Sequence, residues 1–291
     1  MNVVTLRSPL PTLRRPVLIA AFKGWNDAGE AASGAAAVMS EVLGATPFAD
    51  IDPEEFFDFQ ATRPTVRLVD GGHRTVDWPS NRFSWAELPG ADRHVVLLEG
   101  TEPNLRWRRF TTAVVELATD LGVELVITLG ALQVDVPHSR PVPVTGSTSD
   151  PALAQRLGLR RSLYEGPTGI TGVLHAACAD AGHESVSFWA GVPHYLAGTP
   201  YLAGALALAE RVVDLLGADV PLDDLARDAA AQRDDIAELV AEDDDLAEYV
   251  GELERRDDLE VDDAGELPAT PVSGDELAAE FERYLRDRGE G

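Results

Sequence analysis

The chain has 291 residues, of which 45% are hydrophobic, and carries a net charge of −26 and a single cysteine, Cys178. This length allows a large core in one domain plus appendages, and one cysteine excludes an internal disulfide framework and cysteine-based zinc clusters. The first residues lack the apolar segment of a signal peptide, and every apolar run of membrane-spanning length contains charges. We therefore expect a cytoplasmic protein with no membrane partner.

The negative charge is concentrated at one end of the chain. Residues 218–291 contain 26 acidic and seven basic side chains, a net of −19, which leaves −7 for the rest. This distribution indicates an ordinary core followed by an acidic appendage. The densest basic cluster, at residues 106–109, is too small to neutralise a phosphate backbone, so no nucleic-acid partner is expected.

The first predicted elements are a buried strand at residues 17–22 and a helix at residues 30–43, separated by a polar loop. Strand, loop and helix in this order form the first half of a parallel βαβ unit. The loop contains Lys23, the only lysine of the chain. A single retained lysine suits a site that needs a compact, titratable ammonium, although chance placement is the alternative.

The rest of the core continues this alternation with one interruption. Strands are expected at residues 46–51, 94–99, 125–129 and 185–190, and helices at 107–121, 151–157, 173–181 and 201–216. Residues 1–16 are expected to form an arm, and residues 130–150 a long loop. Residues 64–69 and 74–78 predict a β-hairpin, which breaks the βα alternation and favours a mixed sheet or a side excursion.

Four regions are expected in the complete chain. Residues 1–217 form an α/β core, 218–261 an acidic helical hairpin, 262–274 a polar linker, and 275–291 a C-terminal amphipathic helix. The last helix carries Leu277, Phe281 and Leu285 on one face. A helix of this length is marginal alone, so the stripe must dock on this subunit or on a neighbour.

Polar and aromatic side chains follow several predicted strands and helix starts. Because the carboxyl ends of parallel strands meet at one edge of a sheet, these side chains form a candidate pocket, although any α/β protein has polar residues in such loops. The candidates are Lys23, Trp25, Asn26, Asp27, Glu99, Glu102, Asn104, Gln133, His138, Arg140, Thr168, Thr171, His194 and Tyr195.

None of the motifs among these loops is a complete catalytic or cofactor signature. Gly24 and Gly29 have the spacing of a phosphate-binding P-loop, but Glu30 and Ala31 stand where Lys and Ser or Thr are required. Residues 166–172 (GPTGITG) predict a tight turn and a helix start, whose free N–H groups could also hold an anion. The spacing of the histidines suits no metal, so neither metal nor cofactor is expected.

Five segments resemble one family: residues 23–34, 100–107 (GTEPNLRW), 129–141 (LGALQVDVPHSRP), 166–174 (GPTGITGVL) and 192–196 (VPHYL). Together they are similar to the proteasome assembly chaperone 2 family in its stand-alone actinobacterial form. The resemblance implies a three-layer, mostly parallel mixed sheet similar to nucleoside phosphorylases and related hydrolases, with helices on both faces. It also implies homo-oligomeric assembly and relatives linked to proteasome assembly, and it offers no agreed catalytic residues to transfer.

One departure from the family concerns the end of the sequence. Relatives that dock on the proteasome can end in a hydrophobic-Tyr-any tail, whereas this sequence ends Arg-Gly-Glu-Gly. Tail insertion between proteasome subunits is therefore not expected.

The sequence favours a homo-oligomeric interaction protein of the assembly or scaffold class, without catalysis. The alternative is a small-molecule binder, hydrolase or transferase that takes a nucleoside, phosphate or carboxylate in the candidate pocket. In that alternative Lys23 and Arg140 would bind an anion, and Glu102 or His138 would act as acid or base.

Overall fold

The computed structural model describes residues 3–69, 72–161, 164–196 and 198–262, and these contain a nine-stranded mixed sheet. The spatial order is β1-β3-β6-β7-β2-β8-β11-β9-β10, and the central strands β7, β2, β8 and β11 are mutually parallel. The strands are β1 (Val4–Leu6), β2 (Val17–Lys23), β3 (Thr46–Ile51), β6 (Asn81–Glu87), β7 (His94–Thr101), β8 (Leu125–Val134), β9 (Val144–Thr148), β10 (Arg160–Arg161) and β11 (Glu184–Pro193).

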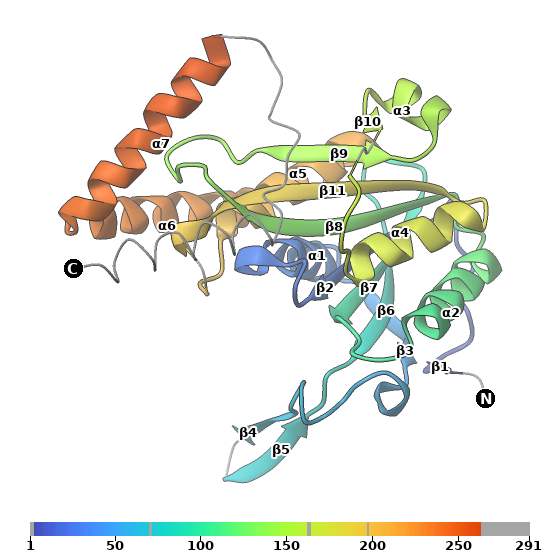
Figure 1. Ribbon diagram of the computed structural model, residues 1–291. Helices are drawn as coiled ribbons and strands as arrows, with labels where there is room; N and C mark the ends of the chain where they lie inside the picture. Colours follow the sequence, from blue (N-terminus) through green and yellow to red (C-terminus); the bar gives the residue numbers. More distant parts are fainter. Residues whose placement is uncertain (1–2, 70–71, 162–163, 197, 263–291) are drawn as a thin grey trace.

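Helices cover both faces of this sheet (Figure 1). On one face, Val17, Ile19 and Ala21 of β2 pack in a core with α1 (Ala31–Val42) and α5 (Leu202–Leu216). On the other face, the alternate residues Leu18, Ala20 and Phe22 pack with α2 (Trp107–Asp120) and α4 (Ile170–Asp180). Burial on both faces explains why β2 is a continuous apolar run. The predicted α/β architecture is confirmed.

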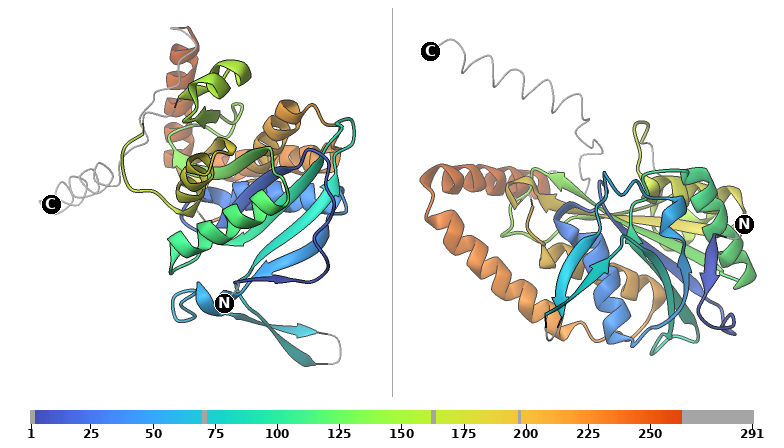
Figure 2. Two further views of the ribbon diagram at one scale, coloured as in Figure 1. Left: turned by 90° about the vertical axis from the view of Figure 1, so that its right-hand side faces the viewer. Right: turned by 90° about the horizontal axis from the view of Figure 1, so that it is seen from below.

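The acidic region forms two antiparallel helices, α6 (Asp223–Ala241) and α7 (Asp244–Asp262). α6 runs outward from the core, α7 turns back from its end, and the two form a V in the second view of Figure 2. Leu225, Ala229 and Ile236 of α6 are buried, so the apolar stripe of that helix packs as its helical spacing predicts. Residues 263–291, which include most of the predicted linker and the whole C-terminal helix, lie outside the described residues.

Four strands were not predicted from the pattern. β1 lies in the expected arm, β6 and the two-residue β10 were missed, and β9 replaces part of the loop expected at residues 130–150. β9 (VTGST) is polar and pairs antiparallel with β11 through its main chain, which leaves no apolar alternation to read. In β6 the buried positions include Asn81 and Ser84, which hide the alternation in the same way.

The predicted hairpin forms a separate two-stranded sheet of β4 (Thr65–Val69) and β5 (His73–Asp77). It projects away from the core (Figure 1). The shorter elements are α3 (Pro151–Leu157) and the 3-10 turns η1 (Ala28–Glu30), η2 (Pro53–Glu55) and η3 (His194–Leu196). No described helix has the length and apolar character needed to cross a membrane.

Candidate functional site

The structure gathers most of the candidate residues into two separate clusters. The first, here the α4 N-terminal cluster, comprises Trp25, Asn26, Glu102 and Thr171 around the start of α4. The second, here the α7 contact cluster, comprises His138, Arg140, His194 and Tyr195 beneath α7. The first is built by the loops after β2 and β7, and the second by those after β8 and β11.

Glu102 closes the α4 N-terminal cluster. Its carboxylate accepts a hydrogen bond from the N–H of Ile170, the first residue of α4, at 2.8 Å, and another from the N–H of Trp25 at 3.4 Å. A negative charge at a helix N-terminus satisfies a free N–H group and interacts favourably with the helix dipole. The anion position that the sequence suggested at this helix start is therefore filled by a side chain of the same protein.

Gly169 permits the close contact between α4 and this loop. A Cβ atom at this position would lie 1.9 Å from Asn26 Oδ1 and 2.7 Å from Glu102 Oε1, so only glycine fits. Asn26 is 4% exposed and Thr171 is 0% exposed, yet Asn26 Oδ1 and Thr171 Oγ1 have no hydrogen-bond partner. Unpaired buried polar atoms are uncommon, and these two are the unsatisfied groups of the cluster.

Asp27 has a structural role at the start of α1. Its carboxylate accepts hydrogen bonds from the N–H groups of Ala32 at 2.8 Å and Ser33 at 3.1 Å, and from the Ser33 hydroxyl at 2.5 Å. Burial raises the pKa of Asp27, and these hydrogen bonds oppose the increase. Asp27 therefore caps the helix, because its oxygens satisfy N–H groups that no helical carbonyl reaches.

The neighbouring Lys23 and Gly29 also have local structural explanations. Lys23 Nζ lies 2.6 Å from Glu30 Oε2, and the lysine side chain is 60% exposed. Gly29 has a φ of +56°, and a Cβ atom there would lie 2.8 Å from the Cβ atom of Tyr201, the N-cap residue of α5. The glycine spacing that resembles a P-loop thus serves a left-handed turn packed against a helix.

A neutral histidine–tyrosine pair forms the centre of the α7 contact cluster. The Tyr195 hydroxyl accepts from the His138 backbone N–H at 2.7 Å and lies 2.8 Å from His138 Nδ1. The second contact is a hydrogen bond in which the hydroxyl donates to Nδ1 or accepts from it, according to the tautomer of the histidine ring. Burial lowers the pKa of His138 and raises the pKa of Tyr195 to about 12, so both groups are uncharged at pH 7.

α7 covers this pair through polar and aromatic contacts. Arg140 Nη2 lies 2.6 Å from Asp258 Oδ1, and the Ser139 hydroxyl donates to Glu254. The Tyr249 ring makes edge contacts with His194, at a centroid distance of 5.3 Å, and with Tyr195, at 6.4 Å. The loops after β8 and β11, where a sheet-edge ligand was expected, are therefore in contact with the protein's own helix.

Of the remaining candidates, Glu99, Asn104 and Gln133 lie apart from both clusters, whereas Thr168 directly precedes Gly169 at the start of α4. Glu99 faces α1 near Ser40, and burial raises the pKa of its carboxyl. It does not meet Glu102, whose carboxylate binds α4 on the opposite face of the sheet. The Asn104 side chain accepts from the Asp58 N–H and the Thr62 hydroxyl and so orders residues 58–62. Gln133 is exposed, and the Thr168 hydroxyl donates to the Gly169 carbonyl at 3.5 Å.

Sequence reasoning missed the side chains that α7 contributes. They are Tyr249, Glu254, Asp257 and Asp258. The spacing of Leu246, Val250 and Leu253 predicts the helix itself, and Tyr249 falls within that stripe. Helical periodicity identifies which face packs but not the surface that it meets.

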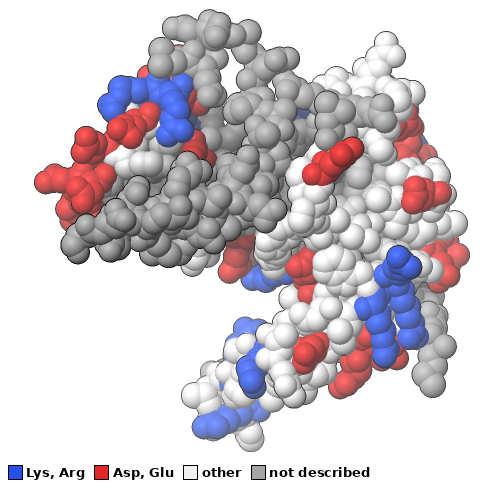
Figure 3. Space-filling model, in the orientation of Figure 1, with Lys and Arg blue, Asp and Glu red and all other residues white. Residues whose placement is uncertain are grey.

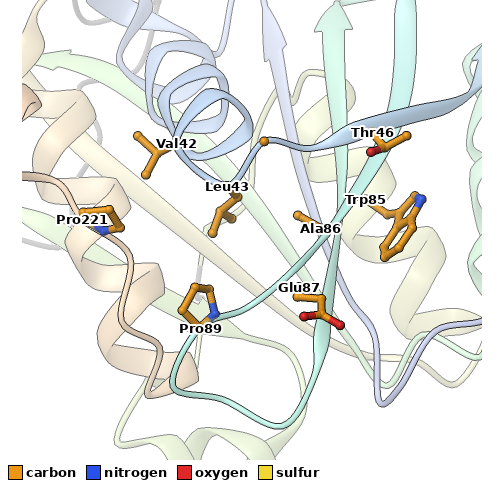
Figure 4. Close-up of a pocket in the computed structure, with 9 residues that line it drawn as sticks. Val42, Leu43, Thr46, Trp85, Ala86, Glu87, Pro89 and Pro221 are labelled. Carbon is orange, nitrogen blue, oxygen red and sulfur yellow. The ribbon is translucent and has the colours of Figure 1, made fainter.

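Two surface depressions lie away from the fourteen candidates. One, of about 490 Å³, is bounded by the end of α1, the start of β3, the end of β6 and Pro221 (Figure 4). The other, of about 510 Å³, lies at the base of the β4–β5 hairpin. In the part of the chain that the structure describes, no group of three or more His, Cys, Asp or Glu side chains is arranged to hold a metal ion.

The comparison of sequence and the comparison of structure both find the same family of known proteins. The model of the PAC2 family matches residues 21–240. A PAC2 family protein from Streptomyces avermitilis is 47% identical, covers 81% of this chain and 99% of its own, and superposes with a TM-score of 0.75. The Mycobacterium tuberculosis proteasome-assembly chaperone homologue Rv2125 is 48% identical over 80% of this chain and 99% of its own, with a TM-score of 0.73.

More distant structures share the fold. Rv2714 from Mycobacterium tuberculosis, described as of unknown function, is 34% identical over 90% of each chain, with a TM-score of 0.82. PbaB from Pyrococcus furiosus, described as an archaeal proteasome activator, is 17% identical over 82% of this chain and 99% of its own, with a TM-score of 0.66. No match was found among the curated proteins.

Proposed function

Because this chain belongs to the PAC2 family, which includes proteins described as proteasome-assembly chaperone homologues, we propose that it is a homo-oligomeric interaction protein of the assembly or scaffold class. The observation that carries this proposal is the position of α7. The helix packs against the loops after β8 and β11, where it contacts Arg140, His194 and Tyr195. The edge at which α/β proteins usually take small ligands binds a helix in this protein.

The chemistry of the covered residues supports an interaction role over catalysis. An acid or base catalyst works best with a pKa near the operating pH. Tyr195, with a pKa of about 12, and His138, whose pKa is lowered by burial, satisfy each other as neutral partners. Glu102 is engaged by two backbone N–H groups, so it serves as a connector between loops.

The partner class follows from the relatives. Rv2125 is described as a proteasome-assembly chaperone homologue and PbaB as a proteasome activator. A proteasome-related protein is therefore the first partner to seek, together with further copies of this chain. Both assignments belong to the proposal.

The proposal is tested by capture of partners and by measurement of oligomeric size. We expect the full chain to be larger than a monomer and to recover a defined partner, and deletion of residues 221–291 to weaken one or both. Since that deletion also uncovers buried core around Leu225 and Ile236, a full-length Tyr249→Ala variant is the second arm. Unchanged size and unchanged partners in both variants would contradict an assembly role for the appendage.

Small-molecule binding at the start of α4 is the second candidate function, favoured by the unpaired Asn26 Oδ1 and Thr171 Oγ1. A thermal-shift screen with nucleosides, phosphates and carboxylates tests it, because a ligand that binds only the folded state raises the melting temperature. Stabilisation that Asn26→Ala or Lys23→Ala removes would support a ligand site. No stabilisation at millimolar ligand would argue against one.

A further inference from the structure

The β4–β5 hairpin carries an apolar face that is largely exposed in the described chain, with only Trp78 at its base in ring contact with Phe59. Residues directly opposite in an antiparallel pair share a face, so Val66, Val76, Leu68 and Arg74 lie together. Leu68 is 73% exposed, Val66 56% and Val76 47%, and Trp78 continues the same alternation at 50%. The alternation that normally marks a half-buried strand is present here without the surface that would bury it.

A projecting two-stranded sheet of this kind needs a binding surface. An isolated hairpin is marginally stable in water, and three strands or packing against a helix are normally required. Contiguous exposed apolar residues on a protein surface mark sites of protein interaction. The hairpin therefore has the properties of an interface element, and a helix is one structure able to complete it.

The charges of the chain favour the acidic helices α6 and α7 as the complementary surface. Residues 63–78 carry three arginines and two aspartates, a net of +1, in a chain of −26. Residues 223–262, which form α6 and α7, carry 17 acidic and four basic side chains, a net of −13. In Figure 3 basic side chains are visible on the projecting hairpin, and acidic ones gather where α6 meets α7.

α6 also presents an apolar anchor within its acidic surface. Leu239 is 64% exposed, and Asp235 lies one turn before it on the same face of α6. The hairpin offers the complementary arrangement, since Leu68 lies directly opposite Arg74. An exposed leucine beside a carboxylate thus matches an exposed leucine beside a guanidinium.

We propose that the β4–β5 hairpin of one copy docks on α6 of a second copy, in a head-to-tail contact that builds the homo-oligomer of the proposed function, on which this inference rests. Within one chain the two features project from different sides of the core (Figure 1). Each subunit therefore donates a hairpin and accepts another. Such a contact closes into a ring or extends as a filament.

Three matched Leu→Asp substitutions at exposed positions test the contact by size-exclusion chromatography with light scattering. Leu68→Asp alters the hairpin, Leu239→Asp alters α6, and Leu105→Asp, at a leucine that is 46% exposed elsewhere, is the control. We expect Leu68→Asp and Leu239→Asp each to weaken self-association about 30-fold or more, as loss of an interface anchor does. Unchanged circular dichroism and melting temperature confirm that each variant is folded.

Mixing the Leu68→Asp and Leu239→Asp variants tests whether the contact between copies is head-to-tail. A Leu239→Asp chain keeps an intact hairpin and a Leu68→Asp chain keeps an intact α6, so an equimolar mixture forms one-to-one pairs while neither variant assembles alone. Loss of assembly in Leu68→Asp only would overturn α6 as the occupant and indicate hairpin-to-hairpin pairing. Assembly of wild type that neither substitution weakens would overturn this inference and leave the proposed function standing, whereas a monomeric wild type would overturn homo-oligomerisation itself.

Discussion

At the scale of single residues, Glu102 joins three segments that are distant in the sequence. Its backbone N–H donates to the Lys23 carbonyl at 2.8 Å, while its carboxylate accepts from Trp25 and Ile170. The loop after β2, the loop after β7 and the first turn of α4 therefore depend on one side chain. This explains a structural need for the acidic residue in the GTEPNLRW segment without any catalytic role.

Replacing Glu102 by Gln should lower the free energy of unfolding by about 1–3 kcal/mol, because hydrogen bonds to a charged acceptor and its interaction with the helix dipole are weakened. Urea denaturation monitored by circular dichroism measures the change. Glu116→Gln, at an exposed position of α2, is the control and should have little effect. Equal stability of the Glu102 variant and wild type would show that the carboxylate charge is unimportant.

His138 should make stability depend on pH in a defined direction. Its pKa is lowered in the folded state by burial, so the unfolded chain binds the proton more readily. The stabilising contribution is fully present above the ordinary histidine value of about 6.5 and is lost as the pH falls through the lowered pKa. His175, buried and shifted in the same direction, adds to this effect.

The measurement is the melting temperature between about pH 7.5 and about pH 5.5, a window that spans the ordinary histidine pKa. His138→Gln should lose less stability than wild type over this window, although it is less stable at the upper end because the Tyr195 bond is altered. Asp27 and Glu99 have raised pKa values and act in the opposite direction below this window, so the comparison rests on the difference between variants. If the melting temperatures of wild type and His138→Gln changed equally with pH, His138 would not be a source of the pH dependence.

At the scale of elements, α7 packs through the buried Val250 and Leu253, and its aromatic and ionic contacts with the loops differ in strength. The Arg140 and Asp258 side chains are 38% and 62% exposed, and ion pairs at such positions contribute about 0–1 kcal/mol. Each aromatic pair contributes about 0.5–1.5 kcal/mol beyond the area that it buries, and Tyr249 forms two such pairs. The aromatic residue should therefore matter more than the ion pair.

Tyr249→Ala should accelerate amide hydrogen exchange along α7 by about tenfold or more, with no change in β2 or β8, because local opening of the helix becomes easier. Asp258→Asn serves as the comparison and should produce a smaller acceleration. A larger effect of Asp258→Asn would reverse this ranking of aromatic and ionic contributions. Acceleration in the central strands would show instead that α7 unfolds with the core.

At the scale of the whole molecule, charge acts on self-association in two ways. It opposes the approach of two copies at long range and favours their contact at short range. Two copies of −26 repel at long range, whereas the hairpin of one and the acidic helices of another attract at contact. At about 0.1 M salt the Debye length is about 10 Å, so the long-range repulsion is already screened and the local attraction remains. Raising the salt further should therefore act mainly on the contact.

Self-association should weaken as the salt concentration rises from about 0.1 M to about 1 M, where the Debye length falls to about 3 Å. Sedimentation velocity measures the oligomer fraction at each concentration. Arg74→Gln, which removes one positive charge from the hairpin, should flatten the salt dependence. Tighter association at high salt in both proteins would indicate an interface that is apolar throughout.

Much of the architecture was available from the sequence because its signals are local. The apolar run of β2, the helical stripes of α1 and α6, and the paired strands of the hairpin depend on periodicity within a few residues. Each was placed close to its observed bounds. Family membership was likewise readable, because the segments at residues 23–34, 100–107 and 166–174 combine glycine and acidic positions that the fold requires.

Tertiary structure decided what the fourteen candidate residues contact. Their convergence into one ligand pocket stays a prediction. Eight of them are divided between the start of α4 and the loops that α7 covers, and the other six belong to neither cluster. Contacts such as Glu102 with Ile170 and Arg140 with Asp258 join residues far apart along the chain, and no local pattern encodes them. Sequence by itself determined most of the helices and strands and the acidic character of α6 and α7. Only the packed fold decided that α7 covers the sheet edge and that the β4–β5 hairpin is left exposed, because both outcomes depend on which surfaces lie within contact distance.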